Sequence, residues 1–314
     1  MCQINKYVHF YIFFGITLTC IMQAISFRCD ENKLKWEQEI YVDSFGLGDF
    51  ESIQEAIDSI PSGNVNWTII RIEPGIYREK IIVPEDKPHI ILSGSGAKST
   101  IITGNLGGGI FNSSIVSIFA SNFVAKRLTI ENTHKPGTQA VALRVRGDKV
   151  AFYSCRFIGY QDTLLDEKGR HYYKNCYIEG TIDFICGNAA SLFDHCHIHC
   201  IAPKAMNGVI TAQRRTTWEE NTGFYFTKSN ITGVNNCYLG RPWGNYSRVV
   251  FAHTHMSSAV LPLGWNDWNK PFTQSTVYYG EHDCYGPGSD RSSRVAWSRS
   301  LTSDEALPFL WFLA

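Results

Sequence analysis

The sequence carries no excess charge of either sign. Its 29 Lys and Arg residues balance 29 Asp and Glu residues, so the formal net charge is zero. A chain without a basic field lacks the general electrostatic attraction that draws proteins to nucleic acid. The sequence also lacks a Gly-x-Ser-x-Gly segment, which excludes a serine esterase built around a nucleophile elbow. No low-complexity linker divides the 314 residues, and one folded unit is expected.

The N-terminal segment has the pattern of an export signal. Lys6 supplies a positive charge, and residues 7–22 are largely apolar but interrupted by polar residues and short for a membrane-spanning helix. We predict a signal peptide over residues 1–26, a leader over 27–40 and a folded domain over 41–314. Secretion, with no membrane attachment after cleavage, follows from this prediction. Four glycosylation sequons agree with it, at Asn66, Asn112, Asn230 and Asn245.

A repeat in the middle of the chain indicates the fold. The segment Cys155-Arg156-Phe157-Ile158-Gly159 returns as Cys176-Tyr177-Ile178-Glu179-Gly180, and a third copy begins at Cys196. A period in the low twenties with short β-rich units is typical of a solenoid. The apolar runs do not alternate cleanly, which favours parallel strands. We predict an all-β fold, a single-stranded right-handed parallel β-helix. The aligned cysteines are either disulfide-bonded or a ladder of buried thiols.

Other segments are assigned around this solenoid. Residues 49–60 have helical periodicity and are expected to cap one end. A second short helix is expected after Ser303. Residues 204–221 are polar and positive, which predicts a surface excursion. Residues 264–300 are rich in Gly, Trp, Asn and Ser and are expected to form long loops near the cleft.

Two carboxylates in apolar surroundings mark a candidate site. Asp162 and Asp183 lie 21 residues apart, one repeat, so stacking of successive coils brings them together. Gln139 and Gln161 should lie alongside. Like charges this close do not easily both ionise, so one carboxyl keeps its proton and can act as an acid beside a nucleophile or base. Because Gln161 and Asp162 are adjacent, the strand must bulge or turn for both to reach the site.

Five ordered segments resemble the signature segments of plant pectin methylesterases, the pectinesterase family, over roughly residues 41–310. They are Gly75-x-Tyr77-x-Glu79, Gln139-Ala140-Val141-Ala142-Leu143, Tyr160-Gln161-Asp162-Thr163-Leu164, Asp183-Phe184-Ile185-x-Gly187 and Leu239-Gly240-Arg241-Pro242-Trp243. The resemblance implies a right-handed parallel β-helix that hydrolyses methyl esters of cell-wall homogalacturonan. The gap between Ser26 and Tyr41 is too short for the inhibitor-like pro-region of some members.

The resemblance also implies residue roles. Asp183 would be the nucleophile, Asp162 the acid and then the base, and Gln139 and Gln161 the oxyanion donors, while Arg241 would hold Asp183. These roles agree with general chemistry: a guanidinium lowers a carboxylate's pKa and fixes its position, and preorganised amides stabilise an oxyanion. Three aromatic side chains are expected to line the sugar cleft: Tyr160, Phe184 and Trp243.

The implied partners follow from the same resemblance. The substrate would be methyl-esterified homogalacturonan in the cell wall, and a proteinaceous pectinesterase inhibitor is a candidate partner. A monomer without cofactor or metal is expected. Two features depart from the family pattern: Cys186 replaces a common aromatic residue, and the chain ends early.

Other interpretations remain open at this stage. The acids could cap backbone amides, the glutamines could form an amide ladder, Arg241 could serve a structural ion pair, and Trp243 could be core. The run Asp194–Cys200 looks like a metal cluster, but strand alternation separates its cysteines from its histidines. His134 and His171 are expected in loops. Rival functions are another pectin-active enzyme on the same fold and a catalytically impaired pectin-binding homologue.

Overall fold

The computed structural model describes residues 35–311. The predicted signal peptide and most of the predicted leader lie outside the described residues. Within residues 35–311, no helix is long and apolar enough to cross a membrane. The first strand begins at Gln38, inside the segment predicted as leader.

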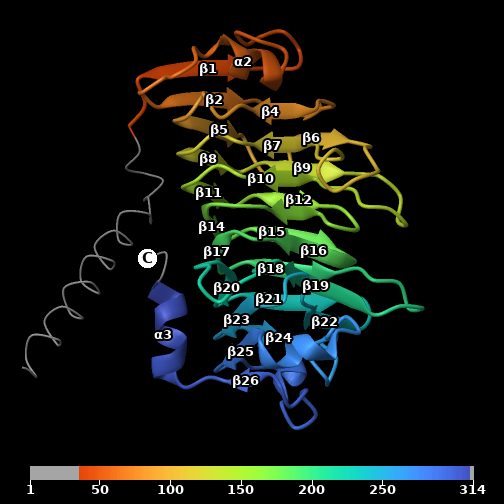
Figure 1. The fold of residues 1–314 in the computed structure, drawn as a ribbon. Coiled ribbons are helices and arrows are strands. Elements are labelled where there is room, and N and C mark those ends of the chain that lie inside the picture. The colour runs from red at the N-terminus through yellow and green to blue at the C-terminus, as the bar shows by residue number, and fades with distance from the viewer. Residues whose placement is uncertain (1–34, 312–314) are drawn as a thin grey trace, which may run out of the picture.

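The molecule is the predicted right-handed parallel β-helix, and Figure 1 shows its coils stacked from the N-terminal to the C-terminal end. Three parallel sheets run along the stack. The largest contains β1 (Gln38–Val42), β2 (Thr68–Ile72), β5 (Ile90–Gly94), β8 (Phe123–Lys126), β11 (Val150–Tyr153), β14 (Arg170–Lys174), β17 (Ala190–Asp194), β20 (Gly223–Thr227), β23 (Arg248–Ala252), β25 (Tyr278–His282) and β26 (Arg299–Ser300).

The other two sheets complete each coil. One contains β3 (Gly75–Tyr77), β6 (Thr100–Gly104), β9 (Thr129–Asn132), β12 (Arg156–Ile158), β15 (Tyr177–Gly180), β18 (His197–Cys200), β21 (Asn230–Gly233) and β24 (His255–Met256). The third, which carries the candidate site, contains β4 (Ile81–Val83), β7 (Val116–Ile118), β10 (Leu143–Val145), β13 (Leu164–Asp166), β16 (Ile182–Gly187), β19 (Gly208–Gln213) and β22 (Cys237–Gly240).

Stacked side chains hold successive coils in register. Five aromatic rings form an internal column with centroid separations of 5.0, 4.6, 4.5 and 4.4 Å, in the order Phe152, Tyr173, Phe193, Phe226 and Phe251. These separations match the spacing of hydrogen-bonded strands, about 4.8 Å, so each ring packs on the one below. The repeated cysteines form a second column. Cys155, Cys176 and Cys196 are buried free thiols, so the predicted ladder of thiols is present and these cysteines are not disulfide-bonded.

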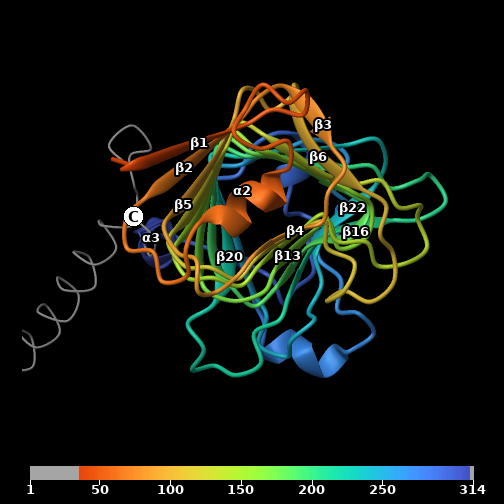
Figure 2. The same ribbon diagram turned by 90° about the horizontal axis from the view of Figure 1, so that it is seen from above.

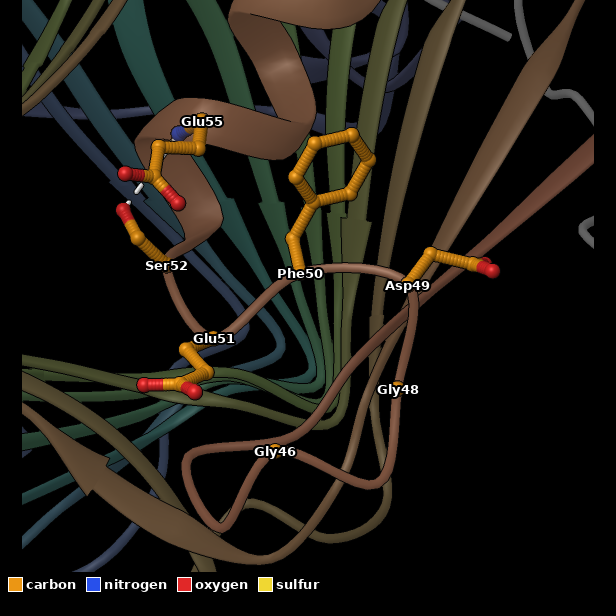
Figure 3. Close-up of a pocket in the computed structure, with 7 residues that line it drawn as sticks. All are labelled: Gly46, Gly48, Asp49, Phe50, Glu51, Ser52 and Glu55. Carbon is orange, nitrogen blue, oxygen red and sulfur yellow. Dashed lines mark hydrogen bonds between the residues drawn. The ribbon is translucent and has the colours of Figure 1, made fainter.

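Helix α2 (Ile53–Ser59) lies across the N-terminal end of the stack, as Figure 2 shows, and buries Ile53, Ala56 and Ile57. The predicted capping helix is confirmed but is shorter than residues 49–60. Its start is set by Ser52, whose hydroxyl accepts from the Glu55 backbone N–H. The segment before it forms a loop that lines a shallow hollow with the first turn of the helix, and in Figure 3 Phe50 points toward the helix.

Glu79, in the first of the five signature segments, stabilises this helix. Its carboxylate accepts from the Ser52 hydroxyl at 2.7 Å and from the backbone N–H groups of Ile53 and Gln54 at 3.0 Å each. A negative charge at a helix N-terminus is favourable, because it satisfies free N–H groups and complements the helix dipole. The segment therefore has a structural role at the end of the solenoid.

At the other end, helix α3 (Ser303–Trp311) confirms the predicted terminal helix, and Figure 1 shows it beside β20, β23 and β25. Two loop predictions are wrong. The segment 204–221 contains the fully buried strand β19, and the segment 264–300 contains β25, β26 and the short helices η1 (Pro271–Ser275) and η2 (Pro287–Ser289). In both cases the pairing of the strand with the previous coil outweighs the polar composition of its flanks.

Candidate active site

A small hollow lies on the sheet that contains β10, β13, β16, β19 and β22. Its volume is about 120 Å³, and it is lined by Ile110, Gln139, Asp162, Asp183, Cys186, Ala212, Trp243 and Trp268. Four of the residues predicted for the site therefore share one concave surface: both acids, one glutamine and one tryptophan. A concave surface with a few convergent polar groups is the usual form of a ligand site.

The backbone at both acids departs from regular strand geometry. Asp162 has φ 61° and Asp183 has φ 50°, in the left-handed region that Asp tolerates better than most residues. The pairing of β16 with β19 also shifts register between Ile182 and Ile185. These turns remove the difficulty that adjacent residues of a strand face opposite ways. The predicted irregularity is therefore present, and it lies at both acids.

Asp183 is held by a bidentate ion pair. The Nε of Arg241 donates to Oδ1 at 2.8 Å, and its Nη2 donates to Oδ2 at 2.6 Å. The other side of the guanidinium packs on Trp268, with Cζ 3.7 Å from the ring centroid. A planar fork between a carboxylate and an aromatic face can adopt few other positions. The fork also fixes the orientation of the Asp183 carboxylate, which is 5% exposed.

The two acids differ in their electrostatic surroundings. Burial, reinforced by the charge of Asp183, raises the pKa of Asp162 to about 7, against weaker lowering effects of Gln139 and Arg241. Burial also raises the pKa of Asp183, and the Arg241 fork opposes that rise. The prediction that Arg241 lowers the pKa of Asp183 is wrong for the net effect, because the loss of water outweighs the ion pair.

Of the two acids, Asp162 is the one that carries a proton. Its Oδ2 is buried and has no hydrogen-bond partner within the described residues, whereas both oxygens of Asp183 accept from Arg241. A buried carboxylate oxygen without a donor is costly when charged. The geometry therefore favours a neutral Asp162 beside an ionised Asp183, which is the pairing expected of an acid and a nucleophile.

The two glutamines are not equivalent. Gln139 lines the hollow, and its Oε1 accepts from the Ile110 backbone N–H at 3.1 Å, which directs the Nε2 donors the other way. Gln161 is half-buried, stands outside the set that lines the hollow, and reaches the next coil through a backbone bridge to Ile182. Of the two, Gln139 is therefore the better-positioned oxyanion donor.

Comparison with known proteins decides the family. The family model described as Pectinesterase matches residues 39–310. The chain belongs to the pectinesterase family. With this membership it is a carboxylic ester hydrolase.

Individual pectinesterases agree over most of the chain. An Arabidopsis thaliana relative, provisionally named pectinesterase 11, is 52% identical over 273 residues, covering 86% of this chain and 77% of the relative. Arabidopsis thaliana pectinesterase 31 is 43% identical, covering 86% and 90%. The solved pectin methylesterase from carrot is 37% identical, with a TM-score of 0.85, covering 87% of this chain and 91% of that one.

The aromatic residues predicted for the cleft of this pectinesterase have different positions. Trp243 lines the hollow, and the Arg214 guanidinium lies 4.9 Å from its ring centroid. Tyr160 is half-buried and stands outside the lining set, and its contact with sugar stays a prediction. The prediction for Phe184 is wrong: its side chain is 0% exposed and packs in the core, because it follows the turn at Asp183 and points inward.

Two residues that line the hollow, Trp268 and Cys186, were not predicted to do so from the sequence. Trp268 has φ 56°, a conformation that is costly for a bulky residue, and it comes from the segment predicted as loop. Trp268 lies outside the five signature segments, so no pattern in the sequence indicated that it belongs to the site. Cys186, which departs from the family pattern, is a neighbour of the two acids, and the sequence did not predict this. It lies on the floor of the hollow with Ala212, where a small side chain leaves the space that an aromatic ring would occupy.

The run Asp194–Cys200 has no metal-binding arrangement. The Thr232 hydroxyl lies 2.7 Å from His197 Nε2 and 2.6 Å from His199 Nδ1, so both rings are satisfied by one neighbouring side chain. His134 lies in a loop as predicted. His171 does not: it is buried in β14, where its Nδ1 lies 2.5 Å from Asp166 Oδ1.

Proposed function

We propose that this chain hydrolyses the methyl esters of homogalacturonan in pectin, releasing methanol and leaving free carboxylates. One observation carries the proposal: a carboxylate oriented by a bidentate guanidinium lies in the same hollow as a second carboxyl whose pKa is raised to about 7. A glycosidase also uses two carboxyl groups, but it does not require an arginine fork on one of them.

In the first half of the reaction, an oxygen of Asp183 attacks the carbonyl carbon of the ester. The charge that develops on the carbonyl oxygen is stabilised by the amide N–H donors of Gln139, with Gln161 as a second donor. Neutral Asp162 gives its proton to the departing methoxide, which leaves as methanol. The product is an acyl-enzyme in which Asp183 is joined to the substrate as an anhydride.

In the second half, Asp162 is anionic and takes a proton from water as the water attacks the anhydride carbonyl. The bond to Asp183 breaks, the galacturonate carboxyl is released, and Asp162 is again protonated. Arg241 keeps Asp183 in place throughout, so the returning carboxylate needs no reorganisation. Trp243 supports the sugar by stacking and apolar contact.

The test is an assay of methanol release from highly esterified pectin, together with the length of the polymer. We expect methanol in proportion to new carboxylates, with no shortening of the chain. Shortening without methanol would favour a glycosidase or lyase. Tight pectin binding with neither product would favour a catalytically impaired binding homologue.

We also propose that the protein is secreted and acts in the cell wall as a monomer. The apolar N-terminal segment and the four sequons support export. A proteinaceous inhibitor remains a candidate partner, and mixing the secreted protein with such an inhibitor in the methanol assay tests it.

A further inference from the structure

Two histidines and an aspartate converge on the outer surface of the last complete coils, away from the hollow. The ligand atoms of His253, His282 and Asp283 all lie within 4.8 Å of one another. His282 Nε2 lies 3.4 Å from Asp283 Oδ2, and His253 Nδ1 lies 4.0 Å from the same oxygen. We propose that these three side chains form a binding site for a divalent transition-metal ion of the zinc class.

The solenoid itself creates this cluster. Ala252 pairs with His282 in the parallel register of β23 and β25, so the residues that follow each, His253 and Asp283, occupy equivalent positions in consecutive coils. Both have left-handed backbones, with φ 48° and 45°, which turns their side chains outward. The His253 N–H donates to the His282 carbonyl at 2.9 Å, so the backbone of the two coils is tied at this point.

The hydrogen bonding of His282 leaves a lone pair directed into the cluster. Its Nδ1 lies 2.9 Å from the Leu301 carbonyl oxygen, which can only accept, so Nδ1 carries the proton. In a neutral ring Nε2 is then an acceptor, and it faces another acceptor, Asp283 Oδ2. A metal ion bound between the two atoms resolves this opposition, as a second proton on the ring would. A histidine whose second nitrogen donates to a backbone carbonyl is the usual arrangement of a metal ligand.

The donor set selects the class of metal. Two imidazoles and one carboxylate suit Zn²⁺ and its neighbours, whereas Ca²⁺ and Mg²⁺ prefer oxygen ligands. Bond lengths of about 2.0–2.2 Å in a tetrahedron place ligand atoms about 3.3–3.6 Å apart. The His282–Asp283 separation already fits. His253 and Asp283 have side-chain exposures of 41% and 68%, so both can rotate to close the remaining gap, with water as fourth ligand.

The expected consequence is stabilisation of the C-terminal end of the stack. Beyond β25, within the residues that the structure describes, the sheet continues only as the two-residue strand β26. An ion held by residues of two consecutive coils links them, and it binds the folded chain alone because the site does not exist in the unfolded chain. This inference is independent of the proposed ester hydrolysis.

The experiment uses the full secreted chain, stripped with EDTA and dialysed, and titrated calorimetrically with zinc chloride and separately with calcium chloride. We expect one equivalent of zinc and no calcium at this site. His253→Ala and Asp283→Asn, both at exposed positions, should each weaken zinc binding at least tenfold. The midpoint of thermal unfolding should rise with zinc in the wild type and not in these variants.

His195→Ala is the matched control. His195 has the same left-handed backbone, lies beside a carboxylate with its Nδ1 2.6 Å from Asp194 Oδ1, and is half-exposed. This variant should bind zinc as the wild type does. The proposal is overturned if the wild type binds no zinc, or if His253→Ala and Asp283→Asn bind it unchanged, since the ion would then be adventitious only.

Discussion

Asp162 and Asp166 are four residues apart in one coil, and both are buried, yet their surroundings are opposite. Asp166 is 0% exposed and fully paired: Tyr173 donates its hydroxyl at 2.7 Å, Ser191 donates to the other oxygen, and His171 lies against the first. Asp162 is 3% exposed and has an oxygen without a partner.

This difference is the one expected between a structural acid and the acid that we propose for catalysis. Burial alone would lower the pKa of His171, but the charge of Asp166 and the hydrogen bond between them raise it, so the cluster behaves as a buried ion pair. Such a pair is costly to break. One oxygen of Asp162 has no donor among the described residues, and the raised pKa of this acid agrees with its proposed role as proton donor. Burial by itself therefore does not distinguish the two acids; the hydrogen bonding of their oxygens does.

The strongest test of the comparison is Asp183→Asn. Asn tolerates the left-handed backbone at this position and nearly preserves the shape, but it cannot attack the ester. We expect methanol release to fall by about 10⁴-fold or more, as with other nucleophiles, with an unchanged circular dichroism spectrum. Asp148→Asn, at a half-exposed acid paired with Arg170 away from the hollow, is the control and should stay active. Wild-type activity in Asp183→Asn would refute the assigned mechanism.

Asp166→Asn should have the opposite effect: lower stability with retained turnover. Removing the charge leaves His171 without its anion inside the core, which destabilises the fold by about 3–5 kcal/mol. Urea unfolding would measure the loss. The folded fraction should keep its turnover per molecule, because Asp166 lies outside the hollow. A variant of unchanged stability and lost turnover would remove the distinction between the two acids.

Asp162→Asn tests the raised pKa through stability. Asp162 titrates at about 7 in the folded chain, against an ordinary value of 3.8. Between these values the native state holds a proton that the unfolded chain has lost, so wild-type stability decreases as pH rises toward 7. The Asn variant lacks this dependence. The free energy of unfolding of the Asn variant, relative to that of the wild type, should therefore increase by about 4 kcal/mol between pH 3 and pH 8.

Denaturant unfolding at those two pH values checks this expectation. A constant difference between variant and wild type would show that Asp162 titrates normally. In that case Asp162 would resemble a solvated acid and could not serve as proton donor at neutral pH.

The two glutamines give a smaller contrast within the site. Gln139→Leu should lower kcat by about 10²-fold or more, as loss of an oxyanion donor does elsewhere. Gln161→Leu should cost less, because Gln161 stands outside the hollow in the free protein. Single-turnover methanol release compares them. Equal losses would mean that Gln161 moves into the site when substrate binds.

The sequence alone determined the fold and the meeting of the two acids of the site. A period of about 21 residues places equivalent positions side by side, so stacking predicts that Asp162 and Asp183 meet without knowledge of any long-range contact. The capping helix and the terminal helix follow from local periodicity in the same way. In a solenoid, residues at equivalent positions of consecutive repeats are neighbours in space. Contacts of this kind can therefore be predicted from the sequence.

Only the tertiary structure decided whether the side chain at a given position points into the core or toward the site. Phe184 points to the core because the left-handed turn at Asp183 rotates the chain, and a pattern of residue types does not contain that rotation. Trp268 reaches Arg241 from a long connection, whose path depends on packing rather than on the repeat. The state of the two acids also depends on burial and on which oxygens find donors, and these are properties of the assembled molecule.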